Sequence, residues 1–139
     1  MFDSEKLANY WLTTAVDDLD SCKELLKSRK YHHALYFGQM YLEKLFKAVT
    51  VSTQHKHALP IHNLVELSKR ASIEIAEEEK DLLEEISTFN MEARYDNDKF
   101  DFYKKTTKEY ADIWMKHIER IGLWLQTTYL SNSKIQPLK

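Results

Sequence analysis

The stretch KYHHALYFGQMYLEKLFKA, residues 30–48, decides the fold of this chain because apolar residues recur in it every three to four positions. This spacing predicts a long helix from about Tyr31 to Thr53. Its apolar arc is wide, which is typical of a central helix that several neighbours contact. The arc contains Ala34, Phe37, Gly38, Tyr41, Leu42, Leu45, Phe46 and Val49. Since glycine inside a helix costs about 1 kcal/mol relative to alanine, Gly38 indicates that another helix crosses closely at this point.

A polar stripe runs along the same predicted helix. Four of its side chains share one face because they are four, three and four positions apart: His32, Tyr36, Gln39 and Glu43. Lys47 continues the stripe by one turn, and His33 lies beside it. Two interpretations stay open: the stripe is either a solvent-exposed face with ordinary ion pairs, or a surface that binds a ligand or a partner protein.

Helical periodicity extends over most of the chain, which contains only two glycines and two prolines as breakers. Besides the central helix, we expect helices over about residues 4–27, 62–71, 77–93 and 102–130, with a polar loop at residues 94–98. Asp3 or Ser4 is the expected cap of the first helix, and Pro60 lies in the connection after the second. The predicted fold is all-α, an up-and-down helical bundle of about five helices, three long and two shorter. Residues 1–131 are expected to form a single domain and residues 132–139 a C-terminal tail.

The composition excludes several classes of protein. The formal net charge is −2 and the pI is about 6.3, so no global basic field holds a long duplex and no DNA partner is expected. No apolar run reaches the length of about 18 residues that a membrane span needs, and the N-terminal segment MFDSEKLANYW lacks the features of a secretory signal. The single cysteine, Cys22, cannot form an internal disulfide and is expected to be a small buried hydrophobe. We therefore expect a cytoplasmic protein that does not contact a membrane.

Asp18 lies between Ala15 and Cys22 on the apolar side of the first predicted helix. An ionised carboxylate at such a position is costly without a partner, so we expect Asp18 to be paired and to have a structural role. The candidate partners are the hydroxyl of a tyrosine in the bundle, a histidine near the start of the second helix, and Arg94. The sequence does not distinguish among them.

The sequence predicts neither a metal site nor a cofactor. No helix carries a Glu-x-x-His pair, and three histidines fall in or beside a loop that offers no rigid frame for a metal ion: His55, His57 and His62. The chain also has no glycine-rich phosphate loop, no nucleophile elbow and no Cys-x-x-Cys pair.

Three segments of the chain form a recognisable series. The first is YWLTTAVDDLDSCKELLKSRKYHHALYFGQMYLEKLFKAV, residues 10–49, which contains the pattern Tyr-x-x-Ala-x-Tyr-x-x-Gln-x-x-x-Glu-Lys-x-x-Lys-Ala. The others are LPIHNLVEL, residues 59–67, and ARYDND, residues 93–98. In this order they resemble the first helical hairpin, the turn into the third helix and the Ala-Arg-Tyr segment of the HEPN family, the higher-eukaryote and prokaryote nucleotide-binding domain. The resemblance is to its small prokaryotic type and runs nearly end to end.

This resemblance implies two activities. Some HEPN proteins are metal-independent endoribonucleases, often toxins, and others are non-catalytic helical partners of a small nucleotidyltransferase, for which nucleotide binding has been proposed. The nuclease branch carries an arginine that is followed, after four to six residues, by a histidine, because a cation must hold the scissile phosphate while an imidazole moves the 2′-hydroxyl proton. Arg94 matches the arginine, but Lys99, Phe100 and Asp101 occupy the histidine positions. The missing histidine argues against an enzyme.

We accordingly expect a HEPN-like binding module that forms a homodimer, pairs with a small nucleotidyltransferase in a two-component, toxin–antitoxin-like system, and binds a nucleotide or RNA. In this interpretation Arg94 and Lys99 meet phosphate, while His32, Tyr36 and Gln39 face a base or a loop of the partner. Two alternatives remain. One is a metal-independent endoribonuclease with an altered site, in which a histidine from the start of the second helix reaches Arg94; the other is a structural helical dimer without a ligand.

Overall fold

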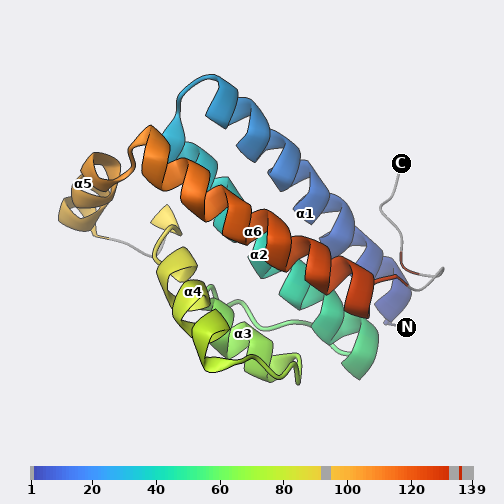
Figure 1. Ribbon diagram of the computed structural model, residues 1–139. Helices are drawn as coiled ribbons and strands as arrows, with labels where there is room; N and C mark the ends of the chain where they lie inside the picture. The colour runs from blue at the N-terminus through green and yellow to red at the C-terminus, as the bar shows by residue number, and fades with distance from the viewer. Residues whose placement is uncertain (1, 92–94, 132–134, 136–139) are drawn as a thin grey trace.

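The computed structural model of the chain describes residues 2–91, 95–131 and 135 (Figure 1). Within these residues it contains six α-helices and no strand: α1 Ser4–Lys27, α2 Tyr31–Gln54, α3 Leu64–Arg70, α4 Glu77–Ser87, α5 Asp96–Lys105 and α6 Lys108–Tyr129. The long helices α1, α2 and α6 lie side by side with α2 in the middle, and α3 and α4 pack together beside α2. The expected all-α helical bundle is therefore confirmed. None of the described helices is both long enough and apolar enough to cross a membrane.

The first two helices form a hairpin whose ends follow from the sequence. Asp3, one of the two expected caps, is the N-cap of α1. Its carboxylate accepts a hydrogen bond of 3.1 Å from the backbone N–H of Lys6. At the other end, Arg29 adopts the left-handed conformation with φ of 61°, and the N–H of Lys30 donates to the carbonyl of Leu25 at 2.8 Å. This is a Schellman-type ending in which arginine stands where glycine is usual. The chain can then reverse within three residues.

Both glycines of the chain lie where α2 crosses α6, so the close crossing predicted at Gly38 is confirmed. A Cβ atom built on Gly38 would lie 2.8 Å from Cδ1 of Ile118 on α6. A Cβ atom on Gly122 would overlap the ring of Tyr41. Each helix therefore offers a glycine to a bulky side chain of the other, and this allows the backbones to approach closely.

The region after α4 differs from the prediction. The fourth helix was expected to run to residue 93, but it ends at Ser87 and is followed by a short turn in which the N–H of Asn90 donates to the carbonyl of Ser87 at 3.3 Å. The predicted polar loop at residues 94–98 is also wrong in part, because residues 96–98 form the first turn of α5. Aspartate is common in loops, so the sequence suggested a loop here. In the first turn of α5, however, the negative charges of Asp96 and Asp98 interact favourably with the positive end of the helix macrodipole.

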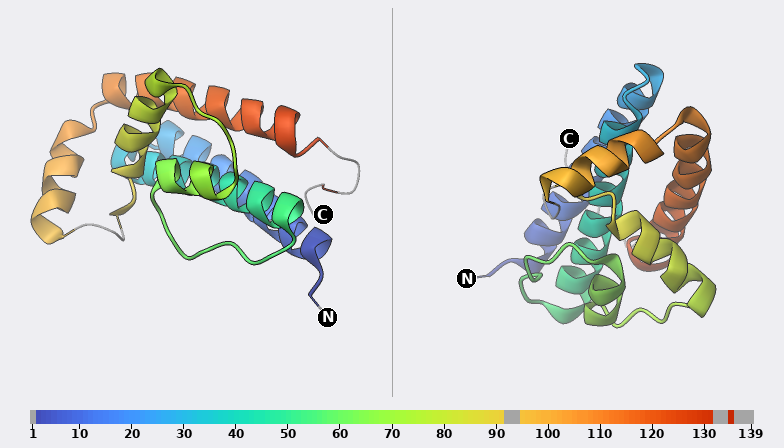
Figure 2. Two further views of the ribbon diagram at one scale, coloured as in Figure 1. Left: turned by 90° about the horizontal axis from the view of Figure 1, so that it is seen from below. Right: turned by 90° about the vertical axis from the view of Figure 1, so that its left-hand side faces the viewer.

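The last predicted helix, residues 102–130, is in fact divided into α5 and α6 at Thr106 and Thr107. The hydroxyl oxygen of Thr107 accepts a hydrogen bond of 3.2 Å from the N–H of Tyr110 and so caps α6. Only Phe102 of α5 is buried, and Figure 2 shows that α5 projects from one end of the molecule. Arg94 lies outside the described residues, as does the predicted tail except for Ile135.

Candidate functional site

The structure divides the polar stripe of α2 into an accessible start and a buried centre. His33 is exposed and His32 is half-buried, whereas the exposed fractions of Gln39, Glu43 and Lys47 are 0%, 6% and 6%. The interpretation as a solvent-exposed face is therefore wrong for the centre of the stripe. The reason is tertiary: His62 and Asn90 come from distant segments to contact Gln39 and Glu43. The ring of Trp11 on α1 lies 5.2 Å from Nζ of Lys47.

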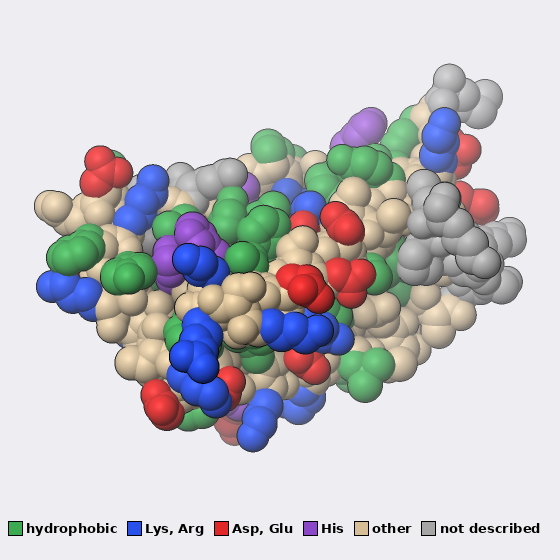
Figure 3. All heavy atoms as spheres, turned by 90° about the horizontal axis from the view of Figure 1, so that it is seen from above, with side chains coloured by type: hydrophobic (Ala, Val, Ile, Leu, Met, Phe, Trp, Pro, Cys, Tyr) green, Lys and Arg blue, Asp and Glu red, His purple; other side chains and the backbone are tan. Residues whose placement is uncertain are grey.

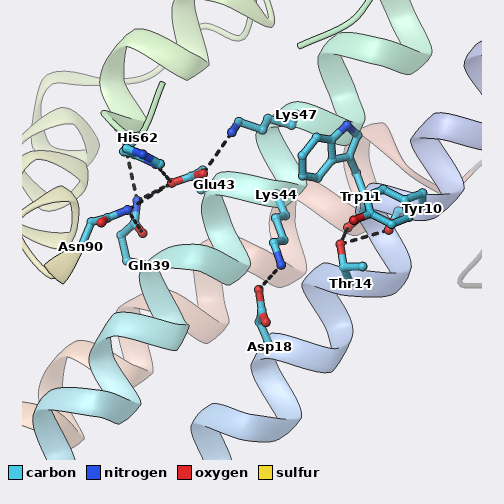
Figure 4. A network of polar contacts seen from close by, with 10 residues as sticks. All are labelled: Tyr10, Trp11, Thr14, Asp18, Gln39, Glu43, Lys44, Lys47, His62 and Asn90. Atoms are coloured by element: carbon cyan, nitrogen blue, oxygen red, sulfur yellow. Dashed lines mark hydrogen bonds and ion pairs between the residues drawn. The ribbon is translucent and has the colours of Figure 1, made fainter. Parts of the chain in front are cut away.

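Glu43 is the hub of the buried part (Figure 4). Its Oε2 atom accepts a hydrogen bond of 3.0 Å from Nζ of Lys47, and its Oε1 atom lies 2.9 Å from Nδ1 of His62. The side-chain amide of Gln39 donates to Oε1 of Glu43 at 3.1 Å and to the carbonyl of His62 at 3.0 Å. The amide of Asn90 donates to Oε1 of Gln39 at 3.1 Å. We call these five residues the Glu43 network.

The Glu43 network joins two of the three sequence segments that carry the family resemblance to a residue just before the third. Gln39, Glu43 and Lys47 belong to the first segment, His62 to the second, and Asn90 precedes the third. Since a buried carboxylate is tolerated only when several donors satisfy it, this network holds the chain segments against α2 rather than offering an open site. Sequence reasoning did not assign His62 and Asn90 to the stripe; the only available signal for His62 was its place in the LPIHNLVEL segment.

Asp18 pairs with Lys44 of α2, whose Nζ atom lies 2.7 Å from Oδ2 of Asp18 (Figure 4). Lys44 was not among the expected partners, so that prediction is corrected, because the long lysine side chain reaches back across the α1–α2 interface. Burial raises the pKa of the Asp18 carboxyl above its ordinary value, although Lys44 acts in the opposite direction. The contact between the two helices thus includes a partly desolvated ion pair.

Cys22 is fully buried, and its thiol donates a hydrogen bond of 3.1 Å to the sulfur of Met115 on α6. Burial raises the pKa of this thiol to about 12. Because the thiolate is the nucleophilic form, Cys22 is a packing residue, as expected from the sequence.

The accessible start of the stripe opens into a surface hollow of about 460 Å³ between the α1–α2 turn and the α5–α6 corner. Eight described residues line this basic hollow: Arg29, Lys30, Tyr31, His32, His33, Tyr103, Lys104 and Thr106. None of these eight is acidic, and three of them carry a permanent positive charge at neutral pH. The left-handed conformation of Arg29 places its side chain at this corner of the molecule.

Three of the rings that line the basic hollow contact one another. The ring centroid of His32 lies 3.9 Å from that of His33 and 4.8 Å from that of Tyr103, which it meets edge-on. Burial, together with the charges of His33 and Lys30, lowers the pKa of His32. His32 is therefore neutral at neutral pH, and the positive potential of the hollow comes from its arginine and lysines.

Tyr36 and Lys99, two further predicted site residues, do not line the basic hollow. Tyr36 is half-buried on α2, with its ring 5.6 Å from that of Phe37. Lys99 is on α5, 3.9 Å from the carboxylate of Asp96. The structure thus brings His32 and His33 together with six residues that sequence reasoning did not select, among them Arg29, Lys30, Tyr103 and Lys104. Within the described part of the chain, no three His, Cys, Asp or Glu side chains are grouped so that they could hold a metal ion.

These features define a class of protein, an all-helical module with a structural polar network and a basic surface hollow. Comparison with protein families matches residues 8–128, most of the chain, to the HEPN domain. The chain therefore belongs to the HEPN family and is a helical module of the nucleotide-binding and ribonuclease-like kind. No curated protein and no solved structure was found to match it.

Proposed function

We propose that this chain is a non-catalytic HEPN binding module that holds a nucleotide in the basic hollow, and that it acts as a homodimer with a small nucleotidyltransferase in a toxin–antitoxin-like pair. The observation that carries the proposal is the lining of the basic hollow, in which Arg29, Lys30 and Lys104 converge without a carboxylate among the described lining residues. Such a site attracts phosphate, because arginine and lysine bind it by charge-assisted hydrogen bonds.

The size and walls of the hollow also suit a nucleotide. Its volume of about 460 Å³ falls within the range of about 300–1,000 Å³ that is usual for small-molecule sites. The rings of His32 and Tyr103 supply flat surfaces for a base, and the hydroxyl groups of Tyr31 and Thr106 supply hydrogen-bonding groups.

The absence of a histidine from the expected positions supports a binding role rather than nuclease chemistry. Lys99, Phe100 and Asp101 occupy these positions on α5. None of the three is an imidazole, the group that most often transfers protons near neutral pH, and such transfer contributes about a hundredfold to ten-thousandfold to catalysis.

One observation favours the endoribonuclease as a second candidate. His32 has a lowered pKa and lies beside Arg29 and Lys30, so a neutral imidazole and phosphate-binding cations are close to one another. Metal-independent cleavage of RNA that leaves 2′,3′-cyclic phosphate ends and is lost in His32→Ala would establish this function. RNA that stays intact after prolonged incubation would exclude it.

A glycine substitution at Arg29 tests the proposed site without harming the fold. Arg29 is in the left-handed region, so Arg29→Gly removes the cation and also relieves the backbone. In calorimetric titrations with uridine monophosphate and adenosine monophosphate, we expect Arg29→Gly to bind at least about tenfold more weakly than the wild type while unfolding at a higher urea concentration.

Ser72→Gly is the matched control, because Ser72 also has a positive φ of 58° and does not line the basic hollow. It should gain stability and keep its affinity. Unchanged binding in Arg29→Gly, or the absence of binding by the wild type, would reject the nucleotide site.

The proposed partner is tested separately by native mass spectrometry of the tagged protein isolated from its own host at modest salt. We expect a dimer of this chain in a stoichiometric complex with a chain of nucleotidyltransferase size. A bare dimer would argue against the two-component system and leave the nucleotide site standing.

A further inference from the structure

The outer face of α5 exposes large aromatic rings. The exposed fractions of Phe100 and Tyr103 are 58% and 57%, and Tyr95, which directly precedes the helix, is 85% exposed. Phe100, Tyr103 and Lys104 are three and four positions apart, so they share one side of α5. The packing of α5 uses the opposite side, where Phe102 contacts the ring of Phe89. Phe102 therefore supplies the buried packing of the helix, and of the exposed rings Tyr103 adds an edge-on contact with His32 on α2.

This face is continuous with the basic hollow. Tyr103 and Lys104 belong to both, and the Nζ atom of Lys104 lies 4.5 Å from the ring centroid of Phe100. On the other side, the ring of Tyr103 meets that of His32, which in turn lies against His33. In Figure 3, hydrophobic side chains, Lys and Arg side chains and a histidine cluster lie together toward the left end of the molecule, where α5 is found. Rings and cations thus alternate from the hollow onto α5.

We propose that the basic hollow and the outer face of α5 together form a track for a single-stranded nucleic acid. The phosphates lie against Arg29, Lys30 and Lys104, and unpaired bases stack on Tyr103 and Phe100. Alternation of cations with exposed rings is the arrangement that binds single strands with little sequence preference, because every base has a face that stacks. This inference rests on the proposed nucleotide site and extends it, since one nucleotide fills the hollow without needing Phe100.

The distribution of charge along α5 favours a polyanion over a protein partner. Lys104 lies at the end of α5 that borders the hollow, while Asp96 and Asp98 lie in the first turn, at the opposite end. Asp101 is three positions from Lys104 and four from Lys105, so it lies beside these lysines. It is one and two positions from Phe100 and Tyr103 and so does not lie between the exposed rings. A duplex is disfavoured because its paired bases cannot stack on the rings.

Fluorescence anisotropy with labelled ten-nucleotide oligouridylate and oligothymidylate tests the track. We expect both strands to bind at least about tenfold more tightly than uridine monophosphate, and Tyr103→Leu and Phe100→Leu each to weaken strand binding by about tenfold. Tyr103→Phe keeps the ring and should bind like the wild type. Tyr10→Leu is the control, because Tyr10 is an exposed tyrosine near the opposite end of α1 with an exposed fraction of 51%.

The salt dependence of the association constant provides a second readout, because it reports phosphate contacts and not base stacking. The logarithm of the association constant for a single strand falls with the logarithm of salt concentration by about 0.7 per phosphate contact. Lys104→Gln should therefore reduce the slope by about 0.7, and Lys116→Gln on the exposed side of α6 should leave it unchanged.

The outcomes separate this inference from the proposed function on which it rests. Binding of the mononucleotide with no gain for the strands, equal binding of a duplex, or leucine variants that bind like the wild type would overturn the track while the nucleotide site stands. Binding of neither mononucleotide nor strand would overturn both. Selective loss in the leucine variants, with retention in Tyr103→Phe, would establish the track.

Discussion

Gly122 illustrates how a single residue sets the distance between two helices. Its α-carbon faces the buried ring of Tyr41, which cannot easily turn away because its hydroxyl accepts a hydrogen bond of 2.7 Å from the side chain of Gln126. We expect Gly122→Ala to lower the free energy of unfolding by about 1–3 kcal/mol in urea denaturation, despite the better helix propensity of alanine.

Gly38→Ala should cost less than Gly122→Ala, because the closest contact of the added methyl group, at 2.8 Å, is with the flexible end of Ile118. Thr128→Ala, at an exposed position of α6, should change stability by no more than about 0.5 kcal/mol. A stability gain in Gly122→Ala would mean that the α2–α6 crossing has room for a side chain.

Asp18 makes the stability of the fold depend on pH. Its pKa is raised in the folded chain, so the folded state holds this proton more tightly than the unfolded state does. The resulting contribution is fully present below the unfolded pKa of about 4 and is lost as pH rises through the folded pKa. Relative to Asp18→Asn, the wild type should therefore become less stable as pH rises from about 4 toward neutrality.

Urea denaturation of both proteins over a series of pH values measures this difference. The opposite slope would show that the ion pair with Lys44, at 2.7 Å, outweighs the desolvation of Asp18.

At the scale of elements, α2 is held to the segments around it by the Glu43 network. Lys47 is 6% exposed, so removal of Glu43 alone leaves a buried cation without its carboxylate. We expect Glu43→Leu to lower the free energy of unfolding by about 3–5 kcal/mol in urea. The double variant Glu43→Leu/Lys47→Met should recover most of this loss, because the network contributes charge compensation rather than net stability. Equal instability of the single and double variants would instead mean that His62 and Asn90 depend on the carboxylate.

Helix α5 is attached to the bundle by few contacts. Phe102 packs its ring 5.5 Å from that of Phe89, and Lys105 forms an exposed ion pair of 2.8 Å with Glu85. Since exposed ion pairs contribute little, Phe102 should dominate the attachment. We expect Phe102→Ala to accelerate amide hydrogen exchange over residues 96–105 while α1 and α2 keep their protection. Asp101→Ala, at an exposed position, is the control, and uniform acceleration over all helices would show that α5 is part of the cooperative core.

At the scale of the whole molecule, the charge is almost balanced but unevenly distributed. The chain has 20 basic and 22 acidic residues, yet the basic hollow has no acidic residue among its described lining. A bound phosphate would raise the lowered pKa of His32, so binding takes up a proton. We expect the affinity for a dinucleoside monophosphate, whose diester does not titrate near neutrality, to rise between pH 8 and pH 6.

Calorimetric titrations of the wild type and of His32→Gln with the dinucleoside monophosphate, over this pH range, measure how much of the pH dependence is due to His32. The variant should bind with little change over the range, whereas His33→Gln should keep most of the dependence, because burial lowers the pKa of His32 and the side chain of His33 is exposed. If the affinity of the wild type did not change with pH, the bound phosphate would not lie close to His32.

Much of the architecture could be predicted from the sequence because it depends on local periodicity. The apolar spacing in residues 30–48 predicted α2 as the central helix, and Gly38 predicted a close crossing, since both follow from the geometry of one helix. The order of the three motif segments correctly indicated the HEPN family. The division of residues 102–130 into α5 and α6 was not predicted, because a threonine pair inside an apolar pattern is a weak local signal.

The sequence by itself thus determined the helical class, the central helix and the family, because these depend on which residues recur along one segment. Only the tertiary structure decided which parts of the polar stripe are buried and which partner Asp18 takes, because both depend on segments far apart in the chain. The same holds for the basic hollow, where residues 29–33 meet residues 103–106. In the sequence, its lysines and arginine do not differ from other surface cations. They form one site only because the fold brings the α1–α2 turn against the α5–α6 corner.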